Sequence, residues 1–518
     1  MIDICYVGNC SIDYIKTKNG FKKTIGGSAI YSSIASRTIT SKNITIISNI
    51  NKEIEKVLIS KNINYIGNIL PKINEFSINE ENRTCNFLEK VEKSIEISEL
   101  LEINHLHISF RKGVDIEKII TNPKIKYKKL TIDVMIHSVE NFIPYIEKYI
   151  DKIDTLFCNM KEYLLLRKYI YSIPKIIITN EDKPVILIDG DSNYFFNVVP
   201  SKNIVSSTGA GDSFIGGFLG ALSENNNINE SINYGISISN LSLQNFGPVK
   251  RKAKIKNNQP QKLPKNIIVI GNSCAGKSTF IKIFKEKFNI YSDIDDLAPL
   301  LEMFKLDDIS RSGNINDLIS IKKDIKYMND IFQQYLNNYN SIDHYSRKSL
   351  SGDGHDIIKP ILWDIILKKS VEKDKSRNNI IQFSRGYDEL YEKEFGHDVY
   401  NRSILAIINA LKERNNLLII NITSDLNVRK IRNYIRYQNG GHFVSEDTMN
   451  KVYGYDIFAY NQLSDNRGFI LINNIKIPVY TIKNNKMLSP FELKKFLTYN
   501  VNEIINYFND LGGCKKWN

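Results

Sequence analysis

Residues 206–214 combine small residues with a carboxylate in a pattern suited to phosphoryl transfer. Gly209, Ala210 and Gly211 stand next to one another and are followed at once by Asp212. Small residues let backbone N–H groups converge on an anion, and a helix that begins there adds the positive end of its dipole. A carboxylate beside such an anion site can take the proton of a hydroxyl that attacks the γ-phosphate of ATP. A glycine-rich turn with a helix-capping Asp is the simpler interpretation of these residues taken alone.

The first half of the chain, roughly residues 1–250, resembles the ribokinase-like (PfkB) carbohydrate and nucleoside kinases. Four motifs match that family in its order, and their residues are Asp13, the pair Gly26 and Gly27, the pair Asn159 and Glu162, and Gly209 to Asp212. The resemblance implies an α/β sandwich with a small lid sheet around residues 76–94. It implies that Asp13 and the glycine pair bind the acceptor substrate, that Asn159 and Glu162 organise Mg²⁺ and phosphate, and that Asp212 is the catalytic base.

Four departures from the family's pattern concern the nucleotide and the cation. Ser206 stands at the first Asp of the family's signature, a position linked there to a monovalent cation, so this cofactor is doubtful. Residues 179–181, Thr-Asn-Glu, replace a Thr-x-Gly nucleotide turn, Pro184 stands where another glycine is common, and Tyr31 replaces an Asn. Proline fixes φ and has no N–H, whereas glycine lets the backbone approach a ligand. We therefore predict weak ATP binding by this half of the chain.

Length and composition limit the number of domains, the kinds of partner and the cellular compartment that we expect. A chain of 518 residues suits two or three domains, and a hydrophobic share of 42% with a charged share of 25% is typical of soluble globular proteins. The net charge of +13 favours anionic partners, for which nucleotides are the simpler explanation and nucleic acid the less favoured one. Six scattered cysteines fit a reduced compartment. Without a long apolar segment or a signal-like start, we expect an intracellular protein with no membrane partner.

Apolar segments alternate with helical ones through the first half of the chain. The expected strands are residues 2–8, 43–50, 103–110, 128–135, 154–160, 175–180 and 184–190. Alternation of this kind predicts a mainly parallel α/β sheet covered on both faces. Residues 250–265 are basic, contain two prolines and lack apolar periodicity, which predicts a linker between a domain of residues 1–249 and one of residues 266–518.

The second half opens with a phosphate-binding pattern of its own. The pattern G-x-x-x-x-G-K-[ST] lies between an apolar strand and an amphipathic helix, and its residues are Gly271, Gly276, Lys277 and Ser278, followed by Thr279. In this context the loop N–H groups cradle phosphates, the lysine reaches the β- and γ-phosphates, and the serine ligates Mg²⁺. These residues predict a P-loop NTPase-type parallel α/β domain that binds ATP.

The rest of this half resembles small P-loop kinases of the nucleoside and nucleotide type. The resemblance implies a substrate-binding role for Asp293 and Asp295 after the second strand. It implies a phosphate- or base-gripping role for Arg385 after the next strand. Arg432 and Arg436 recur at helical spacing and resemble an arginine-bearing lid, although a charged helical face is often merely solvated.

Together these patterns predict a bifunctional ATP- and Mg²⁺-dependent kinase. The first domain would phosphorylate a hydroxyl of a sugar or nucleoside, and the second a nucleoside, nucleotide or related acceptor. Two alternatives stay open: the first domain only senses a sugar or nucleoside, or the second phosphorylates a polynucleotide or a modified DNA base. The sequence indicates no oligomeric state.

Overall fold

The computed structural model describes residues 1–17, 20–82, 84–91, 93–111, 114–201, 203–295, 360–374, 378–386, 399–411, 416–440 and 444–511. The chain divides into two compact units, Met1–Gln261 and Lys262–Asn518. This division falls inside the segment 250–265 that was expected to be a linker, next to the short strand β14 (Gln261–Leu263).

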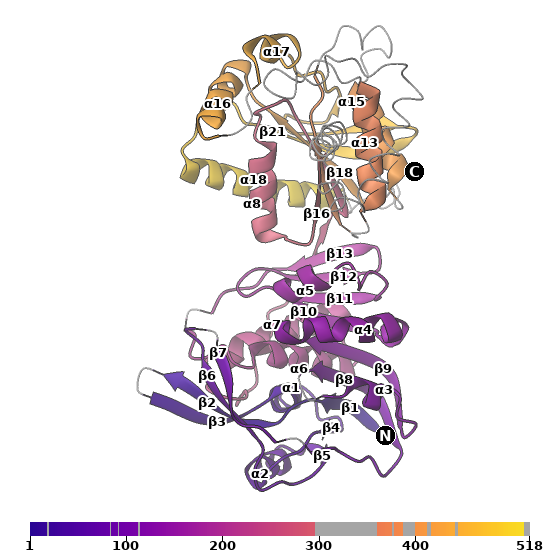
Figure 1. Cartoon of the computed structure of the whole chain (residues 1–518), viewed down its shortest axis with the longest axis vertical. Helices are drawn as coiled ribbons and strands as arrows, with labels where there is room; N and C mark the ends of the chain where they lie inside the picture. The colour runs from indigo at the N-terminus through magenta and orange to yellow at the C-terminus, as the bar shows by residue number, and fades with distance from the viewer. Residues whose placement is uncertain are drawn as a thin grey trace, which may run out of the picture. The chain divides into compact units, whose positions relative to one another are not determined.

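A mainly parallel sheet forms the centre of the first unit (Figure 1). Its strands, in spatial order, are β13 (Ser192–Phe196), β12 (Val185–Asp189), β11 (Lys175–Thr179), β10 (Thr155–Asn159), β9 (Ile125–Val134), β8 (Leu101–Phe110), β1 (Ile2–Val7), β4 (Ile44–Ile47) and β5 (Asn64–Ile66). The strands from β11 to β5 are parallel, and β12 and β13 are antiparallel additions. The central strands are rich in buried apolar residues because helices cover both faces.

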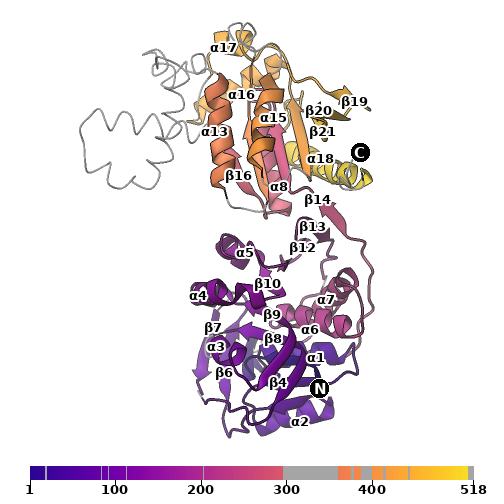
Figure 2. The ribbon, with the colours of Figure 1, turned by 90° about the vertical axis from the view of Figure 1, so that its right-hand side faces the viewer.

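Helices lie on both sides of this sheet. They are α1 (Ser28–Arg37), α2 (Lys52–Ser60), α3 (Ile116–Ile120), α4 (Val139–Tyr149), α5 (Met160–Leu166), α6 (Ala210–Ser223) and α7 (Ile228–Ser242), with short 3₁₀ turns at Ile136–Ser138 and Ile150–Lys152. Figure 2 shows α3, α4 and α5 on one side and α1, α6 and α7 on the other. Ile30, Phe157 and Phe218 belong to the buried apolar cluster that joins α1 and α6 to the sheet.

A separate sheet of four strands completes the first unit, and we call it the lid sheet. Its order is β3 (Gly20–Gly26), β2 (Ser11–Thr17), β6 (Asn74–Asn79) and β7 (Thr84–Glu89). A small sheet was expected around residues 76–94, but the hairpin of β2 and β3 was not. The register sets Asp13 opposite Thr24 and next to Phe76. The lid sheet therefore carries one of the predicted substrate-binding residues.

The second unit contains a seven-stranded sheet of its own. In spatial order its strands are β16 (Ser292–Asp295), β17 (Asn379–Phe383), β15 (Asn266–Ile270), β18 (Leu417–Thr423), β21 (Ile475–Lys483), β20 (Arg467–Ile472) and β19 (Asn461–Gln462). The first five are parallel, and β20 and β19 are antiparallel. Its described helices are α8 (Lys277–Lys287), α13 (Pro360–Lys373), α15 (Val399–Ala410), α16 (Leu426–Gln438), α17 (Glu446–Lys451) and α18 (Pro490–Asp510).

The helices of the second unit also pack in pairs: α13 contacts α15, and α8 contacts α18. Among the helices that the structure describes, in either unit, none has the length and apolarity needed to span a bilayer.

Candidate active site

The predicted anion site lies where α6 begins. Gly209 is the N-cap residue and has a left-handed φ of 75°, and Asp212 lies in the first turn of the helix. A Cβ atom at position 209 would lie 2.3 Å from Cδ1 of Tyr31, so both the backbone conformation and the available space require glycine. The N-terminal N–H groups of a helix are available for an anion, and here they follow a turn of small residues.

Helix α6 is held against α1 at very short range. A Cβ at Gly216 would lie 2.2 Å from the carbonyl oxygen of Ser32. Ser36 donates its hydroxyl hydrogen to the carbonyl of Gly216 at 2.6 Å, and Ser32 donates to the carbonyl of Asp212 at 3.0 Å. Because glycine and serine permit this approach, the two helices fix the position of Asp212.

Asp13 lies on β2 with almost no exposure to solvent. Its exposed fraction is 3%, and Oδ1 accepts a hydrogen bond from the hydroxyl of Ser11 at 2.7 Å. A Cβ at Gly26 would lie 1.8 Å from Oδ2 of Asp13, so the glycine leaves room for this carboxylate. Burial and the charge of Asp212 raise the pKa of Asp13 to about 6, although Ser11 acts in the opposite direction. The two carboxylates therefore share one electrostatic environment.

Gly27 begins α1 and touches the loop after β1. It has a φ of 91°, and a Cβ there would lie 2.2 Å from the carbonyl oxygen of Asn9. That carbonyl also accepts the N–H of Ala29 at 3.2 Å. The glycine pair thus joins the loop after β1, β3 of the lid sheet and the start of α1.

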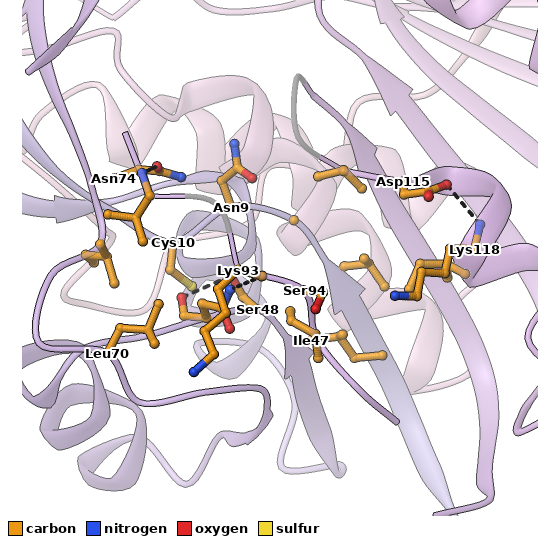
Figure 3. A pocket seen from close by; sticks show the side chains of 18 of the residues that line it. Asn9, Cys10, Ile47, Ser48, Leu70, Asn74, Lys93, Ser94, Asp115 and Lys118 are labelled. Carbon is orange, nitrogen blue, oxygen red and sulfur yellow. Dashed lines mark hydrogen bonds between the residues drawn. The ribbon is translucent and has the colours of Figure 1, made fainter. Parts of the chain in front are cut away.

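A cavity of about 620 Å³ opens beside this loop (Figure 3). Asn9 and Cys10 line it from the loop after β1, and Ser48 from the end of β4. The lid sheet contributes Asn74 and Phe87. Its volume lies within the range of small-molecule sites, and amide, hydroxyl and aromatic groups contribute to its wall.

Arg111 is a central residue of the site that the sequence analysis did not single out. It follows β8, and its Nη2 lies 2.5 Å from Oδ2 of Asp133 and 3.2 Å from Oδ1 of Asp212. The other oxygen of Asp133 lies 3.2 Å from Nε2 of the buried His107, whose Nδ1 lies 3.0 Å from the hydroxyl of Thr131. Asp133 is the penultimate residue of β9 and Arg111 follows β8, and because these strands are parallel neighbours, both residues lie at the carboxyl edge of the sheet.

The charges in this group act against one another. Burial raises the pKa of Asp212, and the guanidinium of Arg111 opposes this rise. Burial also favours protonation of Asp133, but Arg111 and His107 outweigh it and bring the pKa of Asp133 down to about 2. Asp133 is therefore a permanent anion, whereas Asp212 is more basic than an ordinary aspartate.

Asn159 and Glu162 serve as the N-terminal cap of α5. Asn159 Oδ1 accepts the N–H groups of Lys161 and Glu162 at 2.9 and 3.0 Å, and Glu162 Oε2 accepts the N–H of Asn159 at 2.7 Å. This reciprocal pattern is a capping box. Burial raises the pKa of Glu162 to about 7, and the charge of Arg111 opposes that rise, so the carboxyl lies within electrostatic reach of the site. Among the described residues, no group of three His, Cys, Asp or Glu side chains is arranged to hold a metal ion.

Tyr31 places a buried hydroxyl group near the site. In the sequence analysis it was noted only as replacing an Asn of the family's pattern. The side chain is 2% exposed, and within the described part of the chain its hydroxyl has no hydrogen-bond partner. Burial and the charges of Asp13, Asp212 and Glu80 raise the pKa of Tyr31 well above its usual value. The phenol thus lies among the carboxylates of the site.

The altered nucleotide turn has an unusual backbone. Glu181 adopts a φ of +53°, in the left-handed region that favours glycine. The turn closes with the N–H of Lys183 donating to the carbonyl of Asn180 at 2.9 Å, and Pro184 precedes β12. The chain therefore keeps a glycine-like conformation here with a charged residue in it.

In the second unit, the glycine-rich loop connects β15 to α8. Gly276 is the N-cap of α8 with a φ of 110°, and Lys277, Ser278 and Thr279 form the first turn. Lys277 Nζ donates to the carbonyl of Gly271 at 2.9 Å, which folds the side chain back over the loop. The loop therefore lies between a strand and a helix N-terminus, and its lysine bonds a carbonyl of the loop itself.

Ser278 and Asp295 are connected through a residue that the sequence analysis did not name. Gln382, on β17, lies 3.4 Å from the hydroxyl of Ser278 and donates to Oδ2 of Asp295 at 3.1 Å. Asp293 instead forms an ion pair with Lys285 at 2.7 Å. Of the two predicted aspartates, the structure brings Asp295 to the loop and leaves Asp293 at the surface beside α8.

The predicted arginines bind the protein's own groups. Arg385 is 4% exposed, donates to Ser403 at 2.8 Å and lies 3.4 Å from Asp364. Arg432 donates to Asn484 at 3.1 Å and to the carbonyl of Ala275 in the glycine-rich loop at 3.5 Å.

Arg436, one turn further along α16, donates to Asn433 at 3.0 Å. Arg432 is therefore the only one of these three that the described contacts bring to the loop.

Comparison with known proteins agrees with the geometry of the first unit. Residues 27–253 match the model of the pfkB family carbohydrate kinase. This segment is a pfkB family carbohydrate kinase domain. The match includes the predicted residues from Gly27 to Asp212, while Asp13 and Gly26 precede it and the glycine-rich loop of the second unit follows it.

Individual relatives cover different shares of the chain. The ribokinase of Lactococcus lactis subsp. lactis is 35% identical over 107 residues, which are 21% of this chain and 34% of that protein. The chain thus spans about a third of the length of this relative. The cytidine kinase of Thermococcus kodakarensis is 23% identical over 274 residues, 48% of this chain and 98% of that protein. The nucleoside kinase structure of Methanocaldococcus jannaschii has 16% identity, covers 49% of this chain and 95% of its own, and gives a TM-score of 0.39.

Proposed function

We propose that the first unit is an ATP-dependent kinase that phosphorylates a hydroxyl group of a sugar or nucleoside. The observation that carries the proposal is the position of Asp212, a partly buried carboxylate directly after a Gly-Ala-Gly turn at a helix N-terminus. A base and an anion site so close together suit an in-line transfer, because the base can take the proton of the attacking hydroxyl while the N–H groups hold the transferred phosphate.

The acceptor would lie between Asp13 and Asp212. Asp13 would accept a hydrogen bond from one hydroxyl of the acceptor, and Asp212 would accept the proton of the hydroxyl that attacks. The raised pKa of Asp212 suits it to this transfer. Arg111 contacts Asp212 and would offset negative charge as it develops on the transferring group.

The substrate class rests on the adjoining cavity and on the relatives. A cavity of about 620 Å³ beside Asn9 accommodates a sugar or a nucleoside. Two of the relatives described above, a ribokinase and a cytidine kinase, are named for the same two classes.

ATP would bind with its phosphates at the turn that contains Gly209, where a Cβ would overlap the ring of Tyr31. Mg²⁺ bound to the nucleotide would neutralise charge on the phosphates. Because Asn159 and Glu162 already bond each other's backbone, these two residues would contribute through their electrostatic field and through bound water.

For the second unit we propose a P-loop kinase acting on a nucleoside, nucleotide or related acceptor. Support comes from the strand–loop–helix geometry around Gly276 and Lys277, and from the link between Ser278, Gln382 and Asp295. Ser278 and Thr279 would bind phosphate and Mg²⁺, and Arg432 would act from α16.

The test is a screen of sugars, nucleosides and nucleotides with the full chain, ATP and Mg²⁺, in which ADP release and phosphorylated product are both measured. Asp212→Asn should silence one set of acceptors, and Lys277→Ala the other. A chain that phosphorylates no sugar or nucleoside would refute the proposal for the first unit, and loss of both activities in Lys277→Ala would refute two independent sites. Steep loss of binding with added salt would instead favour a polynucleotide acceptor.

A further inference from the structure

The turn after β6 in the lid sheet is hydrogen-bonded to residues 206–208, the segment that leads into the anion site. Glu80 follows β6 directly, and its Oε1 is the acceptor for three consecutive residues. The N–H groups of Ser207 and Thr208 donate at 2.8 Å each. The hydroxyls of Ser206, Ser207 and Thr208 donate at 2.7, 3.3 and 2.7 Å. One carboxylate oxygen thus gathers both backbone and side-chain donors of this segment.

The two sides of this contact belong to different parts of the first unit. Glu80 lies on the lid sheet, which also carries Asp13 on β2. Thr208 directly precedes Gly209, the N-cap of α6. The bonds end at Thr208, whereas a phosphate would bind the N–H groups of Gly209 and Gly211, since the N–H of Ala210 donates to the carbonyl of Ser207 at 3.2 Å. Glu80 therefore shapes the approach to the anion site without occupying it.

We propose that Glu80 is a positioning residue that couples closure of the lid sheet over the acceptor to the formation of a productive anion site. When the lid sheet lies as it does in this structure, Glu80 holds residues 206–208 and so fixes the turn at Gly209. When the lid sheet moves away, all five bonds are lost together. Of the bonds that the structure describes, the segment then keeps only those of Val205 and Ser206 to Leu243 and the local ones of Thr208 to Ser206 and of Ala210 to Ser207. The inference rests on the proposed kinase function of the first unit.

The ionisation of Glu80 supports this role. Burial favours the protonated acid, but the donors from Thr208, Ser206 and Ser207 outweigh it and lower the pKa of Glu80 below its usual value. The side chain is therefore an anion at neutral pH, and bonds to an ionised acceptor are stronger than bonds between neutral groups. In the same segment, Val205 and Ser206 donate their N–H groups to the carbonyl of Leu243, and the N–H of Thr208 also lies 3.2 Å from the hydroxyl oxygen of Ser206.

The variants are compared in the full chain. Glu80→Ala removes the acceptor, Glu80→Gln keeps an oxygen without the charge, and Glu81→Ala is the matched control on the next, exposed residue of the same turn. We expect Glu80→Ala to lower kcat by about 10- to 100-fold, because a displaced anion site costs roughly this much. The dissociation constant of the acceptor should change little, since Asp13 and Gly26 are untouched. The kcat of Glu80→Gln should lie between those of the wild type and Glu80→Ala, and the kcat of Glu81→Ala should match that of the wild type.

Two readouts separate positioning from a general loss of stability. Thr208→Val should lower kcat in the wild type and add little in the Glu80→Ala background, because the bond is already gone. Hydrogen–deuterium exchange of residues 205–212, with the Mg²⁺ complex of the non-hydrolysable β,γ-imido analogue of ATP as probe, should be faster in Glu80→Ala and unchanged in Glu81→Ala.

Several results would overturn the inference. They are a kcat within twofold of the wild type in Glu80→Ala, additive effects of the two substitutions, or unchanged exchange. If the wild type phosphorylates no acceptor, the kinase proposal fails, and the exchange experiment still decides whether Glu80 holds the segment.

Discussion

Replacing Gly26 by alanine should disable the acceptor side of the site through steric overlap. The new Cβ would lie 1.8 Å from Oδ2 and 2.3 Å from Cγ of Asp13, whereas ordinary contacts begin at 3.4 Å. The carboxylate must move by about 1.6 Å to restore such a contact, which breaks the 2.7 Å bond from Ser11. Loss of a bond to a buried charged group costs about 1.5–3 kcal/mol, and overpacking about 1–3 kcal/mol.

These energies predict both a kinetic and a stability effect. If Asp13 binds a hydroxyl of the acceptor, KM should rise by about 10- to 100-fold, since about 1.4 kcal/mol corresponds to a factor of ten. The kcat should fall less, because α1 and α6 still hold Asp212. Because the two costs together amount to about 2.5–6 kcal/mol, and each kcal/mol shifts the midpoint of a unit of this size by about 2–4 °C, the melting temperature of the transition that includes the first unit should fall by about 5–20 °C.

The assay is ADP release at varied acceptor concentration, combined with thermal unfolding of the full chain. Ser11→Ala is the matched control, since it removes the bond without the overlap and should have the smaller effect. In an Asp13→Ala background the overlap is absent, so adding Gly26→Ala should cost little further stability. A Gly26→Ala protein with wild-type KM and melting temperature would refute the reasoning, because it would mean that the carboxylate has room to move.

Three further predictions concern charge and the nucleotide turn. Asp212→Asn should lower kcat of the first unit by about 10²- to 10⁴-fold with unchanged circular dichroism, and near-normal turnover would exclude Asp212 as the base. Because the pKa of Asp13 is raised to about 6, its carboxylate is present above that pH and lost below it. The acceptor KM should therefore rise as pH falls through 6, and a flat profile from pH 5 to 8 would contradict this. Calorimetry on the Lys277→Ala chain should give millimolar ATP binding to the first unit. Adding Glu181→Gly should tighten this binding by relieving a left-handed residue that costs about 1–2 kcal/mol. Micromolar binding in the Lys277→Ala chain, before Glu181→Gly is added, would contradict the prediction.

The strands of the main sheet could be predicted because most of them are rich in apolar residues. Parallel strands buried on both faces have this composition, and the observed β1, β4 and β8 to β12 lie at or near the predicted ranges. The hairpin of β2 and β3 escaped prediction because its residues are largely polar and β3 is mostly exposed. Such strands are defined by their pairing partners, which a local pattern does not contain.

The candidate site shows the same division between local and distant information. Gly209 to Asp212 are neighbours in sequence, so their pattern was visible. Arg111 and Glu80 are about a hundred positions away in sequence from the residues that they contact in the site. The sequence around each of them contains no motif that would identify it as a site residue. Asn159 and Glu162 illustrate an ambiguity of another kind, because a spacing of three suits both a capping box and a pair of metal-directed groups.

The short contact between α1 and α6 has a consequence for how this scaffold could change its substrate. With Gly216 against the carbonyl of Ser32, no side chain can be inserted there without forcing the helices apart. The separation between Asp212 on α6 and Tyr31 on α1 is thus a constant of the scaffold. New acceptors must then be accommodated by substitutions in the cavity wall and the lid sheet, at positions such as Asn74 and Phe87. Libraries for directed evolution toward other sugars or nucleosides should therefore vary the cavity wall and the lid sheet. Variation at the contact between α1 and α6 would yield mainly inactive protein.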